Sequence, residues 1–316
     1  MEISNFWERY KVIFISRKTD FIVMGMPKCA TTSFWLIMRQ HSQVEFPVTG
    51  KHAMYYKKFK SVKAFEKKYW GNMQETARHG FCAEMWDSNL DVKEMSKAFH
   101  PKMKIIFILR NPVERAYSEY KYSYGMDYKN FNIRDSIEFY KLSHADAFDR
   151  YVNRNLNPNK RIFIKYYEYI APFLRYFGED RVKVILFEEM MQDKETIYKE
   201  IFDFLEIEEE DCPFGLKANE GGLKPLNIFA YLAYRWIVMN LLYPFTDRIR
   251  TFVYRKEVSL YCDGLLSYFM KKLLCEDEDH SKMLSRTYRK LQKYYIKDCK
   301  KLSRILGKDV QKIWFG

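Results

Sequence analysis

With 316 residues, of which 47% are hydrophobic, the chain is long and apolar enough to bury a full core, which excludes global disorder. Its net charge of +13 favours acidic partners, such as phosphate or sulfate groups, acidic sugars, nucleic acid or an anionic membrane. The six cysteines have neither CxxC nor metal-ligand spacing, so the sequence indicates no disulfide framework and no metal site, and it favours a reducing cytoplasm.

Two stretches bear on membrane association. Residues 1–18 lack the apolar core that a signal peptide needs. The most apolar window, 228–243, is short for a membrane span and carries Arg235 at its middle, which predicts a buried or interfacial helix. We therefore expect no transmembrane segment, while peripheral contact with a membrane stays open.

Three apolar runs rich in β-branched residues predict buried strands. They lie at 21–24, 104–110 and 181–187, and helical patterns follow them at 31–40, 112–124 and 194–205. Strands that alternate with helices predict an α/β fold, in which a parallel sheet carries helices on both faces. We expect a single domain over 1–316, with a core sheet at about 20–205 and a helical C-terminal portion at about 226–314. Within this portion, Gly307 is the expected C-terminal stop of a helix at 281–307.

The segment FIVMGMPKCATTSF (21–34) resembles a phosphate-binding loop with most of its glycines missing. It predicts a strand, a tight turn after Gly25 and a helix N-terminus, where backbone N–H groups and the helix dipole bind anions. Lys28 adds a charge, and the three residues 31–33 add hydroxyl groups. Because the loop is shorter than GxxxxGK[ST], it suits a single 5′-phosphate and the group that leaves from it.

A second anion site is predicted at the end of the next strand. Arg110 ends the strand, Pro112 suits the first turn of a helix, and Ser118 lies two turns into that helix. Arginine makes planar, bidentate contacts with phosphate. Two anion sites at neighbouring strand ends of this P-loop-like sheet imply a ligand with two separated phosphates.

These residues resemble a known family. PKCATTS (27–33) and LRNPVERAYSEY (109–120) are similar to the two donor-binding motifs of sulfotransferases that use 3′-phosphoadenosine 5′-phosphosulfate (PAPS), most closely the bacterial and heparan-sulfate-type carbohydrate enzymes. VILFEEM (184–190) and NEGGLKP (219–225) also resemble the family, and the resemblance extends over about 20–314.

The resemblance implies roles for individual residues. Lys28 would hold the 5′-phosphosulfate and stabilise charge on the bridging oxygen as the sulfuryl group leaves. The family often has Gly-Gly after this lysine, where this chain has Cys29 and Ala30, which narrows the loop. The implied reaction needs no metal and releases adenosine 3′,5′-bisphosphate (PAP). The implied donor site consists of Lys28, Cys29, Ala30, Thr31, Thr32 and Ser33 in the loop, Arg110 and Ser118 at the 3′-phosphate, and Gly221, Gly222 and Lys224 over the nucleotide.

Two residues compete for the role of general base. His52 stands in VTGKHAMYYKKF (48–59), where the family members usually have a glutamate, and its ordinary pKa suits proton abstraction. Glu84 stands near the position of an acidic residue that lies close to the acceptor in similar enzymes. The residues after Glu84 depart from the family pattern, so the acceptor site is expected to differ too.

The acceptor itself is not specified by the sequence. The resemblance implies a carbohydrate or polysaccharide acceptor, and the positive net charge is compatible with an acidic one. A lipid, a small alcohol or a phenol stays open as the acceptor, and the oligomeric state stays open too. The absence of an anchor or signal favours a bacterial cytoplasmic enzyme over a Golgi enzyme.

Two other functions compete with this one. A P-loop kinase would need GK[ST] after the loop and an acidic strand end for magnesium, but the strand at 104–110 ends in Arg110. A non-enzymatic binder of nucleic acid or membrane would gather its basic residues on one face or tail, whereas the acidic run at 275–280 interrupts them here.

Overall fold

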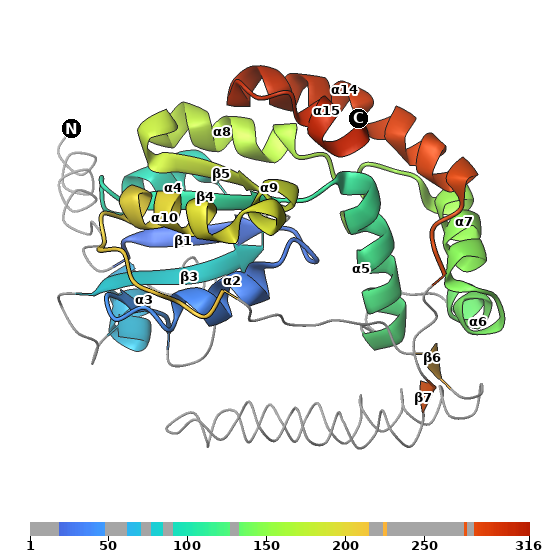
Figure 1. Cartoon of the computed structure of the whole chain (residues 1–316), viewed down its shortest axis with the longest axis horizontal. Helices are drawn as coiled ribbons and strands as arrows, with labels where there is room; N and C mark the ends of the chain where they lie inside the picture. The colour runs from blue at the N-terminus through green and yellow to red at the C-terminus, as the bar shows by residue number, and fades with distance from the viewer. Residues whose placement is uncertain are drawn as a thin grey trace, which may run out of the picture. The chain divides into compact units, whose positions relative to one another are not determined.

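The structure contains a five-stranded parallel sheet with strand order β2-β3-β1-β4-β5 (Figure 1). The computed structural model describes residues 19–47, 62–70, 77–84, 91–126, 133–214, 224–225, 275–276 and 281–316, with only the backbone at some positions, including Glu84. Contacts divide the chain into two compact units, consisting of residues 1–111, 165–218 and 296–316, and of residues 112–164 and 219–295.

The first unit contains the sheet and the helices that cover it. Its strands are β1 (Phe21–Gly25), β2 (Val44–Glu45), β3 (Arg78–Glu84), β4 (Lys104–Leu109) and β5 (Val182–Leu186). Its helices are α2 (Thr31–Met38), α3 (Val62–Trp70), α4 (Val92–Ala98), α8 (Tyr167–Phe177), the short η3 (Glu179–Arg181), α9 (Phe187–Gln192), α10 (Lys194–Leu205) and α15 (Val310–Phe315).

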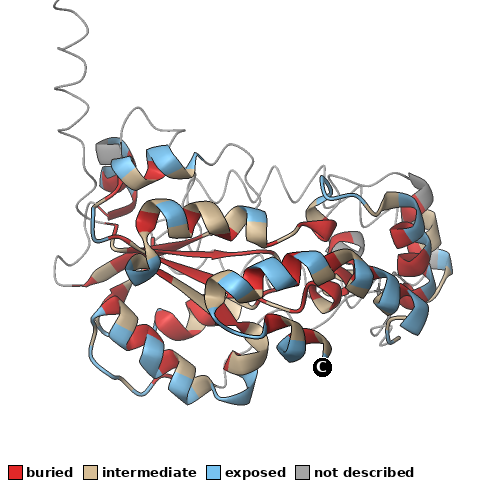
Figure 2. Ribbon diagram, turned by 90° about the horizontal axis from the view of Figure 1, so that it is seen from above, coloured by how far each residue is buried: buried red, intermediate tan, exposed pale blue. Residues whose placement is uncertain are grey.

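The sheet is buried on both faces. All five residues of β1 are buried, as are the five apolar residues of β4 (Figure 2). On one face, Phe173 of α8 packs edge-on against Phe107 of β4, with 5.1 Å between the ring centroids. Strands that are covered on both sides need continuous apolar sequences, which explains why these runs show no alternation of polar and apolar residues.

Helix α10 shows how local sequence and packing agree. The Asp193 side chain accepts a hydrogen bond from the Thr196 N–H at 3.0 Å and so caps the helix N-terminus. Tyr198, Ile201 and Phe202 recur at helical spacing and are all buried. The Tyr198 ring stacks on Phe34 of α2 at 5.8 Å, which fixes the helix that follows the first loop.

The described part of the second unit is mainly helical. It contains α5 (Pro112–Met126), α6 (Ile133–Lys141), α7 (His144–Asn155), the short η2 (Arg161–Phe163) and the paired strands β6 (Lys224–Pro225) and β7 (Cys275–Glu276). Helix α14 (Ser285–Leu306) begins in this unit and ends in the first.

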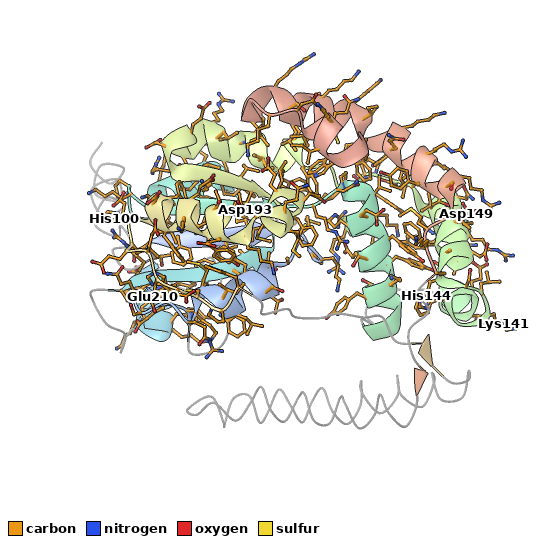
Figure 3. All side chains as sticks on the ribbon, in the orientation of Figure 1. His100, Lys141, His144, Asp149, Asp193 and Glu210 are labelled. Carbon is orange, nitrogen blue, oxygen red and sulfur yellow. The ribbon has the colours of Figure 1, made fainter. Side chains whose placement is uncertain are left out.

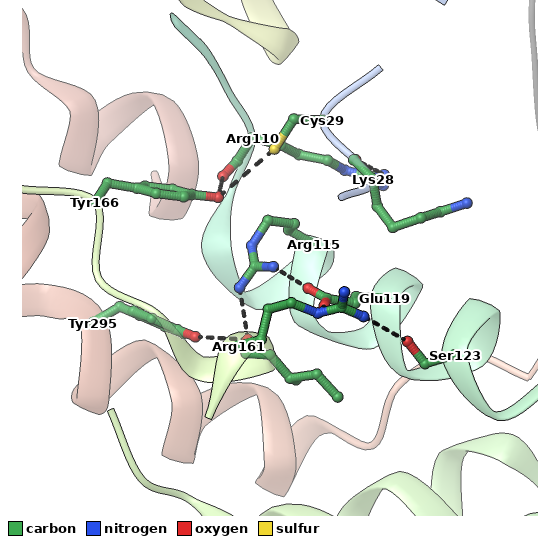
Figure 4. Close-up of polar contacts among 10 residues, drawn as sticks. Lys28, Cys29, Arg110, Arg115, Glu119, Ser123, Arg161, Tyr166 and Tyr295 are labelled. Atoms are coloured by element: carbon green, nitrogen blue, oxygen red, sulfur yellow. Dashed lines mark hydrogen bonds and ion pairs between the residues drawn. The ribbon is translucent and has the colours of Figure 1, made fainter. Parts of the chain in front are cut away.

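Ionic contacts hold the second unit together. In α5 the fully buried Arg115 pairs with Glu119, and it also donates a hydrogen bond to the Ile162 carbonyl at 2.6 Å (Figure 4). The Arg161 Nε lies 2.7 Å from the other oxygen of Glu119. Since an uncompensated buried charge is expensive, this double pairing fixes η2 against α5.

A second ionic contact joins α7 to α14. Asp149, labelled on α7 in Figure 3, accepts hydrogen bonds from the Thr287 hydroxyl and from the Arg286 guanidinium, whose Nη2 lies at 2.9 Å. Burial opposes ionisation of Asp149, but these hydrogen bonds outweigh it and hold the pKa of the carboxyl below its usual range.

The predicted α/β fold is confirmed. The three predicted strands correspond to β1, β4 and β5, and the predicted helices to α2, α5 and α10. Helix α14 ends directly before Gly307, whose φ of 63° is the left-handed conformation expected after a helix C-terminus. The window 228–243 lies outside the described residues, and in the described part of the chain no helix is long and apolar enough to cross a membrane.

Candidate anion-binding site

The loop after β1 has an unusual backbone. Lys28 has φ 71° and Ala30 has φ 63°, so two of three consecutive residues without glycine adopt the left-handed conformation. The Cys29 N–H donates to the Met26 carbonyl at 3.2 Å, which closes a tight turn. Left-handed residues within a turn direct successive N–H groups into one concavity, the arrangement known as an anion-binding nest.

Helix α2 continues this loop. Ala30 stands at its N-cap without a side-chain cap, and the first turn holds no acidic residue. The first-turn N–H groups of a helix have no intrahelical acceptor, and the positive end of the dipole lies there. The half-buried Thr31, Thr32 and Ser33 therefore belong to a helix turn that favours an anion.

Gly25 allows the loop and helix to approach the strand. A Cβ at this position would lie 2.6 Å from the Thr31 Cγ2 and 3.3 Å from the Ile108 carbonyl oxygen. The glycine is therefore required by the close approach of α2 and not by its backbone angles.

Arg110 lies beside this loop. β1 pairs in parallel with β4, and Gly25 stands opposite Ile108, so the loop and Arg110 leave the sheet at the same edge. The Arg110 Nη1 donates to the Lys28 carbonyl at 3.3 Å (Figure 4). Its guanidinium lies over the Phe187 ring at 4.9 Å. In the same view the Lys28 side chain extends away from Cys29.

The strand order explains why an anion site forms at this edge. From β1 the chain builds β2 and β3 on one side and then crosses to β4 and β5 on the other. Ligands in open α/β sheets bind beyond the carboxyl ends of the strands at such a reversal. The structure thus places the Arg110 side chain against the backbone of the Lys28 loop, two segments that the sequence assigns to separate phosphate sites.

The remaining predicted residues are placed only in part. The Glu84 backbone ends β3 in register with Gly25, so it belongs to the same edge of the sheet. Ser118 is half-buried in α5, and the backbone of Lys224 lies in β6; both belong to the second unit. His52, Gly221 and Gly222 lie outside the described residues.

Three residues near Arg110 were not predicted from the sequence as site residues. Phe187 lies under its guanidinium, while Tyr166 and Glu188 bind its backbone and that of its neighbour. Phe187 and Glu188 directly follow β5, so their place at the carboxyl end of a predicted strand is a signal that indicates them. Among the described residues, no group of three or more His, Cys, Asp and Glu side chains is arranged to hold a metal ion.

Comparison with known proteins gives a consistent result. Residues 18–213 match the family described as "Sulfotransferase domain". The chain is 21% identical over 243 residues to carbohydrate sulfotransferase 15 of Mus musculus and equally to that of Rattus norvegicus, with 59% of this chain and 43% of each relative covered. The chain thus spans less than half the length of these curated relatives.

A solved structure shares the fold. The sulfotransferase from Alicyclobacillus acidocaldarius superposes with a TM-score of 0.55 at 16% identity, over 93% of this chain and 98% of that one. The family match covers more than half of the chain and includes the first loop, Arg110 and Glu188. The resemblance drawn from the two sequence motifs is therefore confirmed: this chain belongs to the sulfotransferase domain family.

Proposed function

We propose that the protein transfers a sulfuryl group from PAPS to a hydroxyl group of a carbohydrate acceptor. The observation that carries the proposal is the hydrogen bond from Arg110 to the Lys28 carbonyl. It holds two cationic residues together at one edge of the sheet, one of them in a loop with anion-binding geometry. A ligand with two separated anionic groups fits this arrangement.

The residues present fit such a donor. The nest at Lys28–Ala30 and the N-terminus of α2 suit the 5′-phosphosulfate, because both offer backbone N–H groups to an anion. The Arg110 guanidinium, stacked on Phe187, suits the 3′-phosphate, because a planar guanidinium binds phosphate through two parallel hydrogen bonds. Ser118, Gly221, Gly222 and Lys224 complete the proposed site on the strength of the family motifs.

The chemical roles follow from these positions. When bound, the donor supplies an activated sulfuryl group on a phosphate oxygen. Lys28 neutralises the charge that develops on that oxygen, and the loop and Arg110 hold the nucleotide so that the acceptor can attack in line. The proton of the acceptor hydroxyl goes to a base on the opposite side, for which His52 and Glu84 are both candidates. The register of Glu84 with Gly25 supports Glu84, whereas the pKa of an ordinary histidine supports His52.

The acceptor class and the location are proposed from the relatives, the net charge and the cysteines. The relatives are called carbohydrate sulfotransferases, and the net charge of +13 suits an acidic polysaccharide. The four cysteines in the described part, Cys29, Cys82, Cys212 and Cys299, are thiols, which supports a reducing compartment such as the cytoplasm.

Thermal unfolding with two nucleotides tests the donor. PAP at 100 times its Kd should stabilise the protein by about 2.7 kcal/mol, or roughly 4 °C for a chain of this size. Adenosine 5′-monophosphate at the same concentration should shift Tm far less, because it lacks the 3′-phosphate for Arg110. A chelator should leave the PAP shift unchanged. Equal shifts from both nucleotides would contradict the proposal, and a larger shift from ATP with Mg²⁺ would favour a kinase.

A further inference from the structure

The peptide bond between Arg110 and Asn111 is held from both sides by side chains of distant segments. The Tyr166 hydroxyl donates to the Arg110 carbonyl at 2.8 Å. On the other side of the peptide, the Asn111 N–H donates to the Glu188 Oε1 at 2.8 Å. Beyond the end of β4, two hydrogen bonds therefore fix the orientation of the peptide bond that follows Arg110.

The C-terminal helix completes this arrangement. The Trp314 Nε1 donates to the second Glu188 oxygen at 2.8 Å, and the Asn111 side-chain amide donates to the Trp314 carbonyl at 2.7 Å. The Trp314 ring also packs edge-on against Tyr166 at 5.8 Å. Asn111, Tyr166 and Trp314 are buried and Glu188 is half-buried, so these contacts are partly shielded from water, which strengthens them.

Tyr166 is fixed in turn by α14. The Asp298 carboxylate accepts hydrogen bonds from the Tyr166 N–H at 2.9 Å and the Tyr167 N–H at 3.3 Å. The Tyr166 hydroxyl lies 4.0 Å from the Cys29 sulfur, so the same side chain contacts the Lys28 loop and the Arg110 backbone (Figure 4). The Tyr166 ring therefore has little freedom to move, and its hydroxyl restrains the positions of both the Lys28 loop and the Arg110 backbone.

We infer that Tyr166, Glu188 and Trp314 form a positioning clamp on the Arg110–Asn111 peptide, and that this clamp sets the affinity for the second phosphate of the donor. The inference rests on the proposed function, in which Arg110 binds that phosphate. Bidentate contact between a guanidinium and a phosphate requires a narrow range of orientations, so a small rotation of the peptide weakens it strongly. The clamp residues act through Arg110 and have no assigned contact with the reacting atoms.

The clamp is tested by the ratio of two dissociation constants, that of adenosine 5′-monophosphate over that of PAP, measured by isothermal titration calorimetry. Glu188→Gln and Tyr166→Phe should each lower this ratio by about tenfold, because only PAP carries the 3′-phosphate that depends on the orientation of Arg110, so PAP loses more affinity than the monophosphate does. A purely structural role would change both affinities alike or only the unfolding midpoint. Should Glu188→Gln fail to fold, Tyr166→Phe, which removes a single hydroxyl, carries the same test.

Neighbouring residues provide matched controls. Glu189→Gln removes a carboxylate that pairs with Lys308 at 2.9 Å, and Tyr167→Phe removes the hydroxyl of the adjacent tyrosine. Both controls should keep the ratio of the wild-type protein. If the wild type binds PAP more tightly than the monophosphate but both clamp variants keep its ratio, the proposed role of the clamp is refuted and the proposed function stands. If the wild type itself does not distinguish the two nucleotides, the proposed function and the role of the clamp are both refuted.

Discussion

Replacing Gly25 with alanine tests whether the loop geometry depends on a close contact between β1 and α2. The new Cβ would lie 2.6 Å from the Thr31 Cγ2, well inside van der Waals contact. Overpacking of this kind costs about 1–3 kcal/mol, or roughly 2–5 °C in Tm for a chain of this length. Rotating the Thr31 side chain would relieve the contact, but it would also turn the hydroxyl that we propose binds the 5′-phosphate.

The rescue of this variant is the sharper part of the prediction. Thr31→Ser deletes the clashing methyl group and keeps the hydroxyl, and alone it should cost less than about 1 kcal/mol. In the double variant Gly25→Ala/Thr31→Ser the two changes should offset each other by about 1–2 kcal/mol. The rescue stays partial, because the Ile108 carbonyl oxygen still lies 3.3 Å from the new Cβ.

Denaturant unfolding of the four proteins in this cycle measures the coupling, and PAP binding measures its effect on the site. Gly25→Ala/Thr32→Ser is the matched control, because it removes the same methyl group from the next residue, and it should show no rescue. If Gly25→Ala and Thr31→Ser add within about 0.5 kcal/mol, the steric argument is refuted.

Three further predictions concern the chemistry and the pH dependence. Lys28→Ala should lower turnover by about two to three orders of magnitude, and a loss of donor affinity with intact turnover would make the lysine a binding residue only. The turnover rate should rise with pH through a pKa of about 6–7.5, the range of a mildly perturbed histidine. His52→Ala should abolish this pH dependence and Glu84→Gln should keep it. The opposite result would assign the role of general base to Glu84. Asp149→Asn should lower the free energy of unfolding at pH 7 by about 2 kcal/mol, because its carboxylate accepts charge-assisted hydrogen bonds from α14. Since its pKa is lowered in the folded state, this stabilisation is full above about pH 4 and is lost as the pH falls through the lowered pKa, so unfolding curves of the variant and the wild type should converge in acid.

The sheet and the two cationic residues were predictable because their signals are local. The residues of β1 and residues 105–109 of β4 are apolar, as strands covered on both faces must be. Lys28 lies in the turn after β1 and Arg110 directly follows β4, which made both residues candidates for anion binding. Parallel strands place their carboxyl ends at one edge, so the proximity of Lys28 and Arg110 follows once β1 and β4 are neighbours. The single-domain prediction is not decided by the two compact units and stays a prediction.

The support around Arg110 was not predictable, because it comes from residues with no local pattern. Tyr166 lies 56 positions from Arg110, and Trp314 lies 203 positions from Asn111. Each is an aromatic residue in a chain that is 18% aromatic, and nothing in its neighbours distinguishes it from an ordinary core residue. Only the fold places the Tyr166 hydroxyl against the carbonyl of Arg110.

The left-handed conformation of Lys28 explains how this short loop does without the glycines of longer phosphate-binding loops. A non-glycine residue in this conformation costs about 1 kcal/mol or more, and Ala30 adds a second such cost. Glycine at position 28 would remove the cost but also the ammonium group that the proposed chemistry requires. Contacts with other segments therefore have to stabilise the strained loop. The Lys28 carbonyl accepts a hydrogen bond from Arg110, and Cys29 is buried next to Tyr166. It follows that the residue proposed to bind the 3′-phosphate also maintains the loop proposed to bind the 5′-phosphosulfate, so the two halves of the donor site depend on each other.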